Sequence, residues 1–138
     1  MADSIRRMDY FYVMVNDKPG QASRIVEALA ADGVAMHGFS GFPQGKKKSQ
    51  IVFVPEDAKA FKRSAKKLGL KVSKTRTGFL LQGEDRVGAL SRVLSKLADA
   101  KINMTAIDAV AAGSGRYGAI LWVKQKNVKK AAKALGAR

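Results

Sequence analysis

The feature that most constrains this chain is an internal repeat. Shifting the sequence by 68 residues aligns about forty positions of the two halves without a gap, and Asp17-Lys18-Pro19-Gly20 then falls on Asp85-Arg86-Val87-Gly88. Hydrophobic positions match as well, in the pairs Ile25 and Val93, Leu29 and Leu97, Val34 and Ile102, Met36 and Met104, and Val52 and Ile120. Self-similarity at a fixed offset indicates that one structural unit is used twice. A repeated unit with few polar anchors favours a binding protein over a catalyst.

The repeat also predicts the domain organisation of the 138-residue chain. We expect a first domain over residues 10–77, a second over residues 78–138, and an N-terminal extension over residues 1–9. Domains of this size bury only about 60% of the surface of the unfolded chain. We therefore expect the two domains to support each other, as one rigid pair or as a dimer of pairs.

Hydrophobic periodicity and turn residues predict the same element order in both domains. Asp17 is a good candidate for a helix N-cap, and Pro19 suits a first helical turn. In the first domain we expect strand 10–15, helix 21–32, strands 34–42 and 49–54, helix 57–68 and strand 70–74. In the second we expect strand 78–82, helix 89–100, strands 102–110 and 117–124, and helix 127–135, with no final strand.

This order predicts an α+β fold in which each domain has an antiparallel sheet with both helices on one face. The last strand of such a unit covers the edge of its first strand, so the missing strand leaves residues 79–82 at a bare edge. We expect residues 70–74 to cover that edge and to join the two sheets into one sheet of seven strands. A partner chain at the same edge is the alternative.

Composition restricts the function further. The net charge of +15 is spread over both domains and would attract nucleic acids, acidic proteins and phosphate-bearing metabolites, unless it only marks a basic or salt-adapted proteome. The chain has no cysteine, which excludes disulfides, thiol catalysis and cysteine-ligated metals. No apolar run is long enough to cross a bilayer, and residues 1–9 lack an apolar signal core. We expect a cytoplasmic protein with no membrane contact.

No arrangement of side chains typical of an enzyme is found. His37 is the only histidine and has no companions suited to a metal site, so we interpret it as a strand residue. Gly113-Ser114-Gly115 lacks the following Gly-Lys-Ser pattern of a nucleotide-binding loop. We expect a protein that is not an enzyme and needs no cofactor or metal.

A strand followed by Asp-Lys-Pro-Gly, a helix and a strand led by Gly-Val or Lys-Ile-Asn resembles the ACT domain family, and the resemblance covers nearly all of residues 10–135 in tandem. The resemblance implies two ferredoxin-like βαββαβ units in tandem, the second lacking its final strand. It also implies a regulatory, allosteric role in which a small amino acid binds between modules, where the loop of one meets the second strand of the other. Asn103 matches an asparagine that many family members carry on that strand, whereas Ala35 stands there in the first domain and Val87 replaces the loop proline in the second.

The chemistry of an amino acid suits these loops. A helix N-terminus offers backbone N–H groups to a carboxylate, an Asp at the loop could face the ammonium group, and Gly lets the backbone approach a ligand closely. Each residue also has a structural interpretation: the aspartates as helix caps, the glycines in packing, the asparagine as a partner of a strand edge. The expected ligand-binding residues are Asp17, Pro19, Gly20, Gln21, Asp85, Val87, Gly88, Ala89, Asn103 and Met104.

The expected partners are a small amino acid, further copies of the chain in a homodimer or larger homo-oligomer, and a regulated enzyme. The alternative function is binding of a polyanion such as nucleic acid by the basic faces of the second helix of each domain. Those faces would contribute Lys62, Arg63, Lys66, Lys67, Lys129, Lys130 and Lys133.

Overall fold

The computed structural model describes residues 4–138 and divides the chain into two units. We call residues 9–76 the N-terminal unit, and residues 77–138 together with residues 4–8 the C-terminal unit. Each unit is described by itself, and both take part of the long first strand β1 (Ser4–Asn16). None of the helices in residues 4–138 is long and apolar enough to cross a lipid bilayer.

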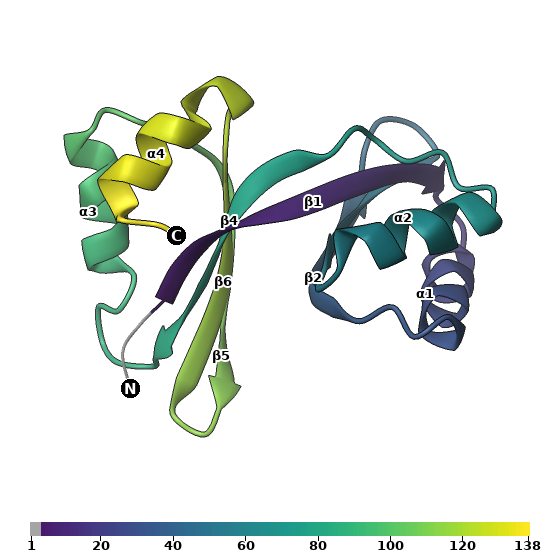
Figure 1. Cartoon of the computed structure of the whole chain (residues 1–138), viewed down its shortest axis with the longest axis horizontal. Coiled ribbons are helices and arrows are strands. Elements are labelled where there is room, and N and C mark those ends of the chain that lie inside the picture. The colour runs from purple at the N-terminus through teal and green to yellow at the C-terminus, as the bar shows by residue number, and fades with distance from the viewer. Residues whose placement is uncertain (1–3) are drawn as a thin grey trace. The chain divides into compact units, whose positions relative to one another are not determined.

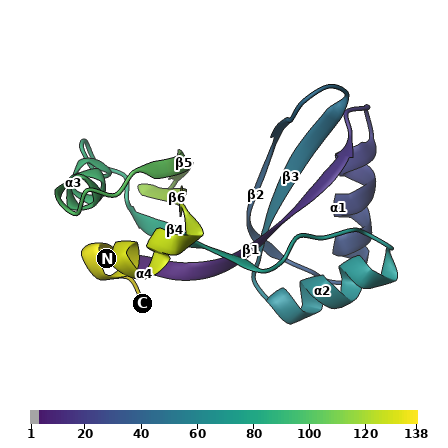
Figure 2. The same ribbon diagram turned by 90° about the horizontal axis from the view of Figure 1, so that it is seen from above.

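The N-terminal unit has the element order expected from the sequence up to its second helix. After β1 come α1 (Gln21–Ala31), β2 (Met36–Pro43), β3 (Lys48–Pro55) and α2 (Ala58–Lys67). The strands pair antiparallel in the order β2-β3-β1, with Val13 opposite Ile51. Figure 2 shows α1 and α2 on the same side of these strands.

Aromatic rings fill the space between this sheet and its helices. Phe61 of α2 stacks on Phe11 with 5.0 Å between ring centroids and lies 5.3 Å from Phe53. All three rings are almost fully buried, and Ile25 and Leu29 add the inner face of α1. The helical spacing of the apolar residues in α1 and α2 therefore places them in one core, as the sequence predicts.

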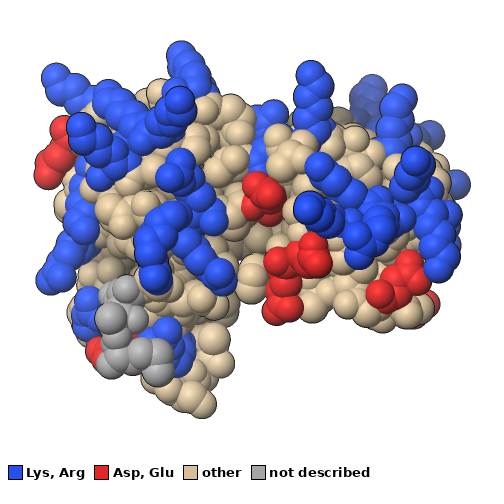
Figure 3. Space-filling view, viewed as in Figure 1, with Lys and Arg blue, Asp and Glu red and all other residues tan. Residues whose placement is uncertain are grey.

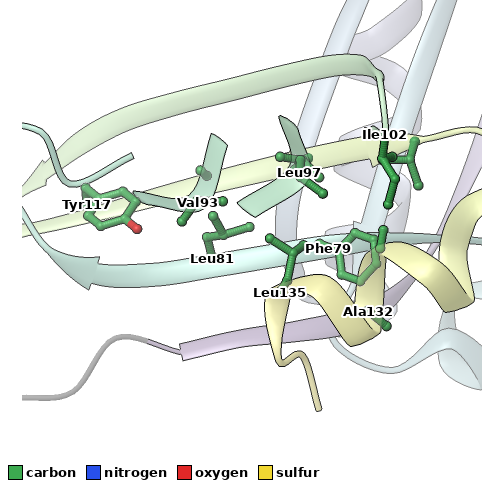
Figure 4. Close-up of a cluster of buried hydrophobic side chains, with 12 residues drawn as sticks. Phe79, Leu81, Val93, Leu97, Ile102, Tyr117, Ala132 and Leu135 are labelled. Carbon is green, nitrogen blue, oxygen red and sulfur yellow. The ribbon is translucent and has the colours of Figure 1, made fainter. Parts of the chain in front are cut away.

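The C-terminal unit repeats this plan with β4 (Arg76–Glu84), α3 (Ser91–Asp99), β5 (Met104–Gly113), β6 (Arg116–Val123), the short 3-10 helix η1 (Gln125–Asn127) and α4 (Val128–Leu135). Its strands follow the order β4-β6-β5, and both pairings are antiparallel. Figure 1 shows α3 and α4 on one side of these strands. Figure 4 shows the core between them, where Phe79 and Leu81 of β4 meet Val93 and Leu97 of α3 and Leu135 of α4.

The strand beside β4 corrects one expectation. Residues 70–74 do not cover this edge, because β1 is the hydrogen-bonded neighbour of β4. Residues 4–8 of β1 belong to the C-terminal unit. Ile5 packs against the core of this unit, and its carbonyl oxygen accepts a 3.1 Å hydrogen bond from the N–H of Arg138. The N–H of Arg7 in turn donates to the carbonyl oxygen of Arg138 at 2.8 Å. Residues 4–9, expected to be an extension, are therefore strand, while residues 1–3 lie outside the described residues.

Residues 70–74 themselves form less structure than expected. Only one β-bridge is found there, between Val72 and Val13. The N–H of Tyr12 donates to the hydroxyl oxygen of Ser73 at 2.9 Å, and the N–H of Ser73 donates to the carbonyl oxygen of Tyr12 at 3.0 Å. Because a side-chain hydroxyl takes the place of a backbone carbonyl as acceptor, the ladder does not continue as a strand.

Candidate ligand-binding clefts at the first helix of each unit

The loop before α1 is hydrogen-bonded to the hairpin of β2 and β3. The N–H of Asp17 donates to the carbonyl oxygen of Lys47 at 2.9 Å, and the Asp17 carboxylate accepts from the Ser49 hydroxyl at 3.0 Å. Asp17 is therefore not the helix cap that we expected. The N-cap is Gly20, whose φ of 89° is a left-handed conformation that costs glycine little.

The loop before α3 has the same construction. The N–H of Asp85 donates to the carbonyl oxygen of Gly115 at 2.9 Å, a bond at the repeat-equivalent position of the one that holds Asp17. Gly88 has a φ of 75°, as Gly20 has a positive φ in the first loop. The carboxylate of Asp85 has no hydrogen-bond partner among residues 4–138, unlike that of Asp17. The Asp85 carboxylate is thus more available than that of Asp17 to accept a hydrogen bond from a ligand.

A cleft lies beside each loop. The first has a volume of ≈ 270 Å³ and runs between the loop before α1 and the end of β2. The second, of ≈ 310 Å³, runs between the loop before α3 and the end of β5. The first is lined by Val15, Asn16, Asp17, Lys18, Gln21, Ala22, Phe39, Gly41, Phe42, Pro43, Ser49 and Ile51. The second is lined by Asp85, Arg86, Gly88, Ala89, Leu90, Ser91, Ala109, Val110, Ala111 and Tyr117.

Both clefts offer one acidic and one basic side chain at a helix N-terminus. Asp17 and Lys18 line the first, and Asp85 and Arg86 line the second, where an Arg86 Nη1 atom lies 4.0 Å from the Glu84 carboxylate. Neither α1 nor α3 has an acidic residue in its first turn or a side-chain N-cap hydrogen bond. The positive end of each helix dipole is therefore not compensated by a local carboxylate of the helix.

The structure places the expected site residues as follows. Asp17 and Gln21 line the first cleft, and Asp85, Gly88 and Ala89 line the second. Pro19, Gly20 and Val87 belong to the same loops but do not line the clefts, and Val87 is fully exposed. Asn103 and Met104 stand at the start of β5, whereas the second cleft meets β5 at residues 109–111. Within the C-terminal unit these two residues are not brought to Asp85.

The sequence interpretation missed the basic partners and the strand walls of the clefts. Lys18 and Arg86 are equivalent in the repeat, so a signal for them was present in the sequence. The walls carry no such signal, because Gly41-Phe42-Pro43 in the first unit corresponds to Ala109-Val110-Ala111 in the second. The first cleft is consequently lined by two phenylalanines, and the second by small aliphatic side chains and Tyr117.

Two ionisable groups with a shifted pKa lie elsewhere in the N-terminal unit. Hydrogen bonds from the buried Ser64 hydroxyl (2.6 Å) and from Lys67 (3.1 Å) lower the pKa of Asp32, at the end of α1. The hydrogen bond from Arg76 Nε to Tyr10 Oη, at 3.2 Å, raises the pKa of Arg76. Among residues 4–138, no group of three His, Asp or Glu side chains is placed to hold a metal ion.

The sequence matches no protein-family model and no curated protein. Solved structures do match. Protein BT0572 from Bacteroides thetaiotaomicron superposes with a TM-score of 0.80 at 16% identity, covering 96% of this chain and 88% of that one. The regulatory subunit of aspartate kinase from Thermus thermophilus gives a TM-score of 0.65 at 17% identity, covering 99% and 95%.

The chain shares the fold of this regulatory subunit. A putative C-terminal regulatory domain of aspartate kinase from Porphyromonas gingivalis is also similar, with a TM-score of 0.53 at 16% identity over 98% of this chain and 95% of that one. These likenesses support the ACT-like, mixed α and β fold that the resemblance in sequence implies. At such identities they concern the fold alone.

Proposed function

We propose that the chain is a regulatory protein of two ACT-like domains, residues 10–77 and 78–138, that binds a small amino acid and is not an enzyme. The observation that carries the proposal is the pair of equivalent clefts, each with one carboxylate and one cation at the N-terminus of a helix. An amino acid presents the complementary pair of charges. Its carboxylate would meet the helix N-terminus and the basic side chain, and its ammonium group would meet the aspartate.

Regulation would follow from linkage. A ligand that binds one arrangement of the domains more tightly than another shifts the population towards that arrangement, and a partner that distinguishes the two reads out the ligand. The partner would be a regulated enzyme, since the structurally similar proteins include a regulatory subunit and a putative regulatory domain of aspartate kinase. Assembly into a homodimer or larger oligomer in the cytoplasm would bring Asn103 and Met104 of one copy towards a loop of another.

The test is a melting-temperature screen of the protein against the twenty amino acids. A ligand at a hundred times its Kd stabilises the folded state by about 2.7 kcal/mol. We expect at least one amino acid to raise the Tm, and Asp85→Asn to reduce that shift more than Asp17→Asn, because Asp17 already shares its carboxylate with Ser49. If no amino acid raises the Tm at millimolar concentration, the proposal fails.

A second candidate function, binding of a polyanion, is favoured by one surface. Within α2, Lys59, Lys62, Arg63, Lys66 and Lys67 are all exposed, no acidic residue lies between them, and of the five only Lys67 forms an ion pair, with Asp32, among the described residues. Figure 3 shows Lys and Arg side chains crowded over the part of the surface that carries α2.

Salt distinguishes the two functions. Binding of duplex DNA through about four such cations would weaken with log salt at a slope of about −3.6, whereas binding of a neutral zwitterion would change little. A DNA affinity that is independent of salt, or unchanged when Lys62 and Lys66 are replaced by Ala, would eliminate this second candidate.

A further inference from the structure

The C-terminal unit contains another cleft, of ≈ 230 Å³, on a different side of α3. It lies between α3, the end of α4 and the residue Ile5 of β1. Arg86, Ala89 and Tyr117 line both this cleft and the one beside Asp85, but Asp85 itself lines only the latter. The two clefts are therefore neighbours with different chemistry.

Among residues 4–138, three cations and no acidic residue line this cleft. Arg92 and Lys96 are four residues apart, so they lie on the same face of α3, and Arg86 comes from the preceding loop. Arg92 and Lys96 are exposed and have no ion-pair partner among residues 4–138, while Arg86 is within 4.0 Å of Glu84. Like charges at this spacing disfavour each other, and a bound anion would remove that cost.

The inner wall of the cleft is apolar. Val93 and Leu135 are buried core residues of this unit (Figure 4). Ile5 packs against the same core. A ligand that fits would place a negatively charged group between the cations and an apolar body against these side chains. The volume is below the range of about 300–1,000 Å³ typical of drug-sized ligands, so the ligand is small.

The N-terminal unit lacks the same cluster. Arg24 corresponds to Arg92 in the repeat, but Ala28 corresponds to Lys96. The paired cations are thus a property of the C-terminal unit and not a general consequence of the repeat. Arg24 provides a matched control for any effect of removing positive charge from a first helix.

We propose that this cleft binds a small dianion with an apolar body, a phosphate monoester or a dicarboxylate, between Arg92 and Lys96. The planar guanidinium group of Arg92 can donate two parallel hydrogen bonds to either group, and the Lys96 ammonium adds a second charge. Arg86 lines both this cleft and the cleft beside Asp85. The site goes beyond the amino-acid function proposed above and does not depend on it.

Calorimetric titration at low salt with phenyl phosphate, inorganic phosphate and succinate tests the site. We expect phenyl phosphate to bind more tightly than inorganic phosphate, because its ring has an apolar wall to contact. The double variant Arg92→Ala, Lys96→Ala should weaken binding about tenfold or more. Arg24→Ala, which removes a positive charge from the N-terminal unit, should leave it unchanged. The preference between phenyl phosphate and succinate assigns the anionic group.

Three results would overturn the proposal. One is the absence of binding by both phenyl phosphate and succinate at millimolar concentration. Another is undiminished binding by the double variant. The third is an equal loss with Arg24→Ala, which would mean that the anion responds to overall charge. The single variants Arg92→Ala and Lys96→Ala, each with the melting temperature of the parent as a control, separate a lost contact from a lost fold.

Discussion

Replacing Gly78 by Ala tests the close packing of Met8, Leu121 and Trp122 around β4. A Cβ atom at Gly78 would lie 3.0 Å from Met8 Cε, 3.2 Å from the carbonyl oxygen of Leu121 and 3.4 Å from Trp122 Cδ1. The Met8 methyl can move, but the Leu121 carbonyl belongs to a paired central strand, so relief requires displacement of backbone. Overpacking of this kind costs about 1–3 kcal/mol.

Urea denaturation followed by tryptophan fluorescence measures this cost. Trp122 is the only tryptophan, so the signal reports on the C-terminal unit. We expect Gly78→Ala to lose about 1–3 kcal/mol and Gly118→Ala, whose nearest neighbour is the carbonyl oxygen of Leu81 at 4.0 Å, to lose much less. Gly78→Ala should cost less in a Met8→Ala background than in the parent protein, because the Met8 methyl no longer meets the new Cβ atom. Met8→Ala alone is the reference for the double variant. Equal stabilities of Gly78→Ala and Gly118→Ala would refute the close packing around Gly78.

Two further predictions concern the N-terminal unit. Asp57→Ala should destabilise it by about 1 kcal/mol, because the Asp57 carboxylate accepts hydrogen bonds from the N–H groups of Lys59 (3.0 Å) and Ala60 (3.2 Å) at the start of α2. Asp17→Ala should leave α1 intact, because Asp17 caps no helix amide. Helix content by circular dichroism measures both effects, and an equal effect of the two changes would contradict the prediction. Because the pKa of Asp32 is lowered from 3.8, its ionised carboxylate stabilises the folded state above pH 3.8, and this contribution is lost as the pH falls through the lower pKa of the folded state. Acid unfolding of Asp32→Asn should lack this contribution. Identical dependence of stability on acidic pH in parent and variant would show that the hydrogen bonds from Ser64 and Lys67 do not matter.

Periodicity predicted what depends on local pattern. The apolar stripes of α1 and α2 and the continuous apolar runs of β3 and β6 predicted the helices, the strands and the two cores, because burial leaves a regular trace in a sequence. The repeat predicted that the helices and strands of the first domain, apart from residues 70–74, have equivalents in the second. Gly20 and Gly88 were expected to let the backbone approach a ligand. Both adopt positive φ, which the sequence interpretation did not predict.

Features that depend on long-range pairing left no such trace. The polar residues Arg6, Arg7 and Asp9 hid the start of β1, whose partner β4 lies about 70 residues away in the sequence. The hydroxyl of Ser73 replaced a strand bond that the apolar spacing of residues 70–74 suggested. The walls of the clefts come from the ends of β2 and β5, where the two halves of the repeat differ. A rule based on one segment cannot anticipate a contact that another segment supplies.

The most direct test of the central claim is an amide NMR titration of the protein with the amino acid that raises its Tm most. If the clefts bind the zwitterion, the amides that shift should lie in residues 17–23 or 85–91, and in the facing strand ends at residues 41–43 or 109–111. Shifts confined to α2 and α4, or spread evenly over the chain, would contradict the account.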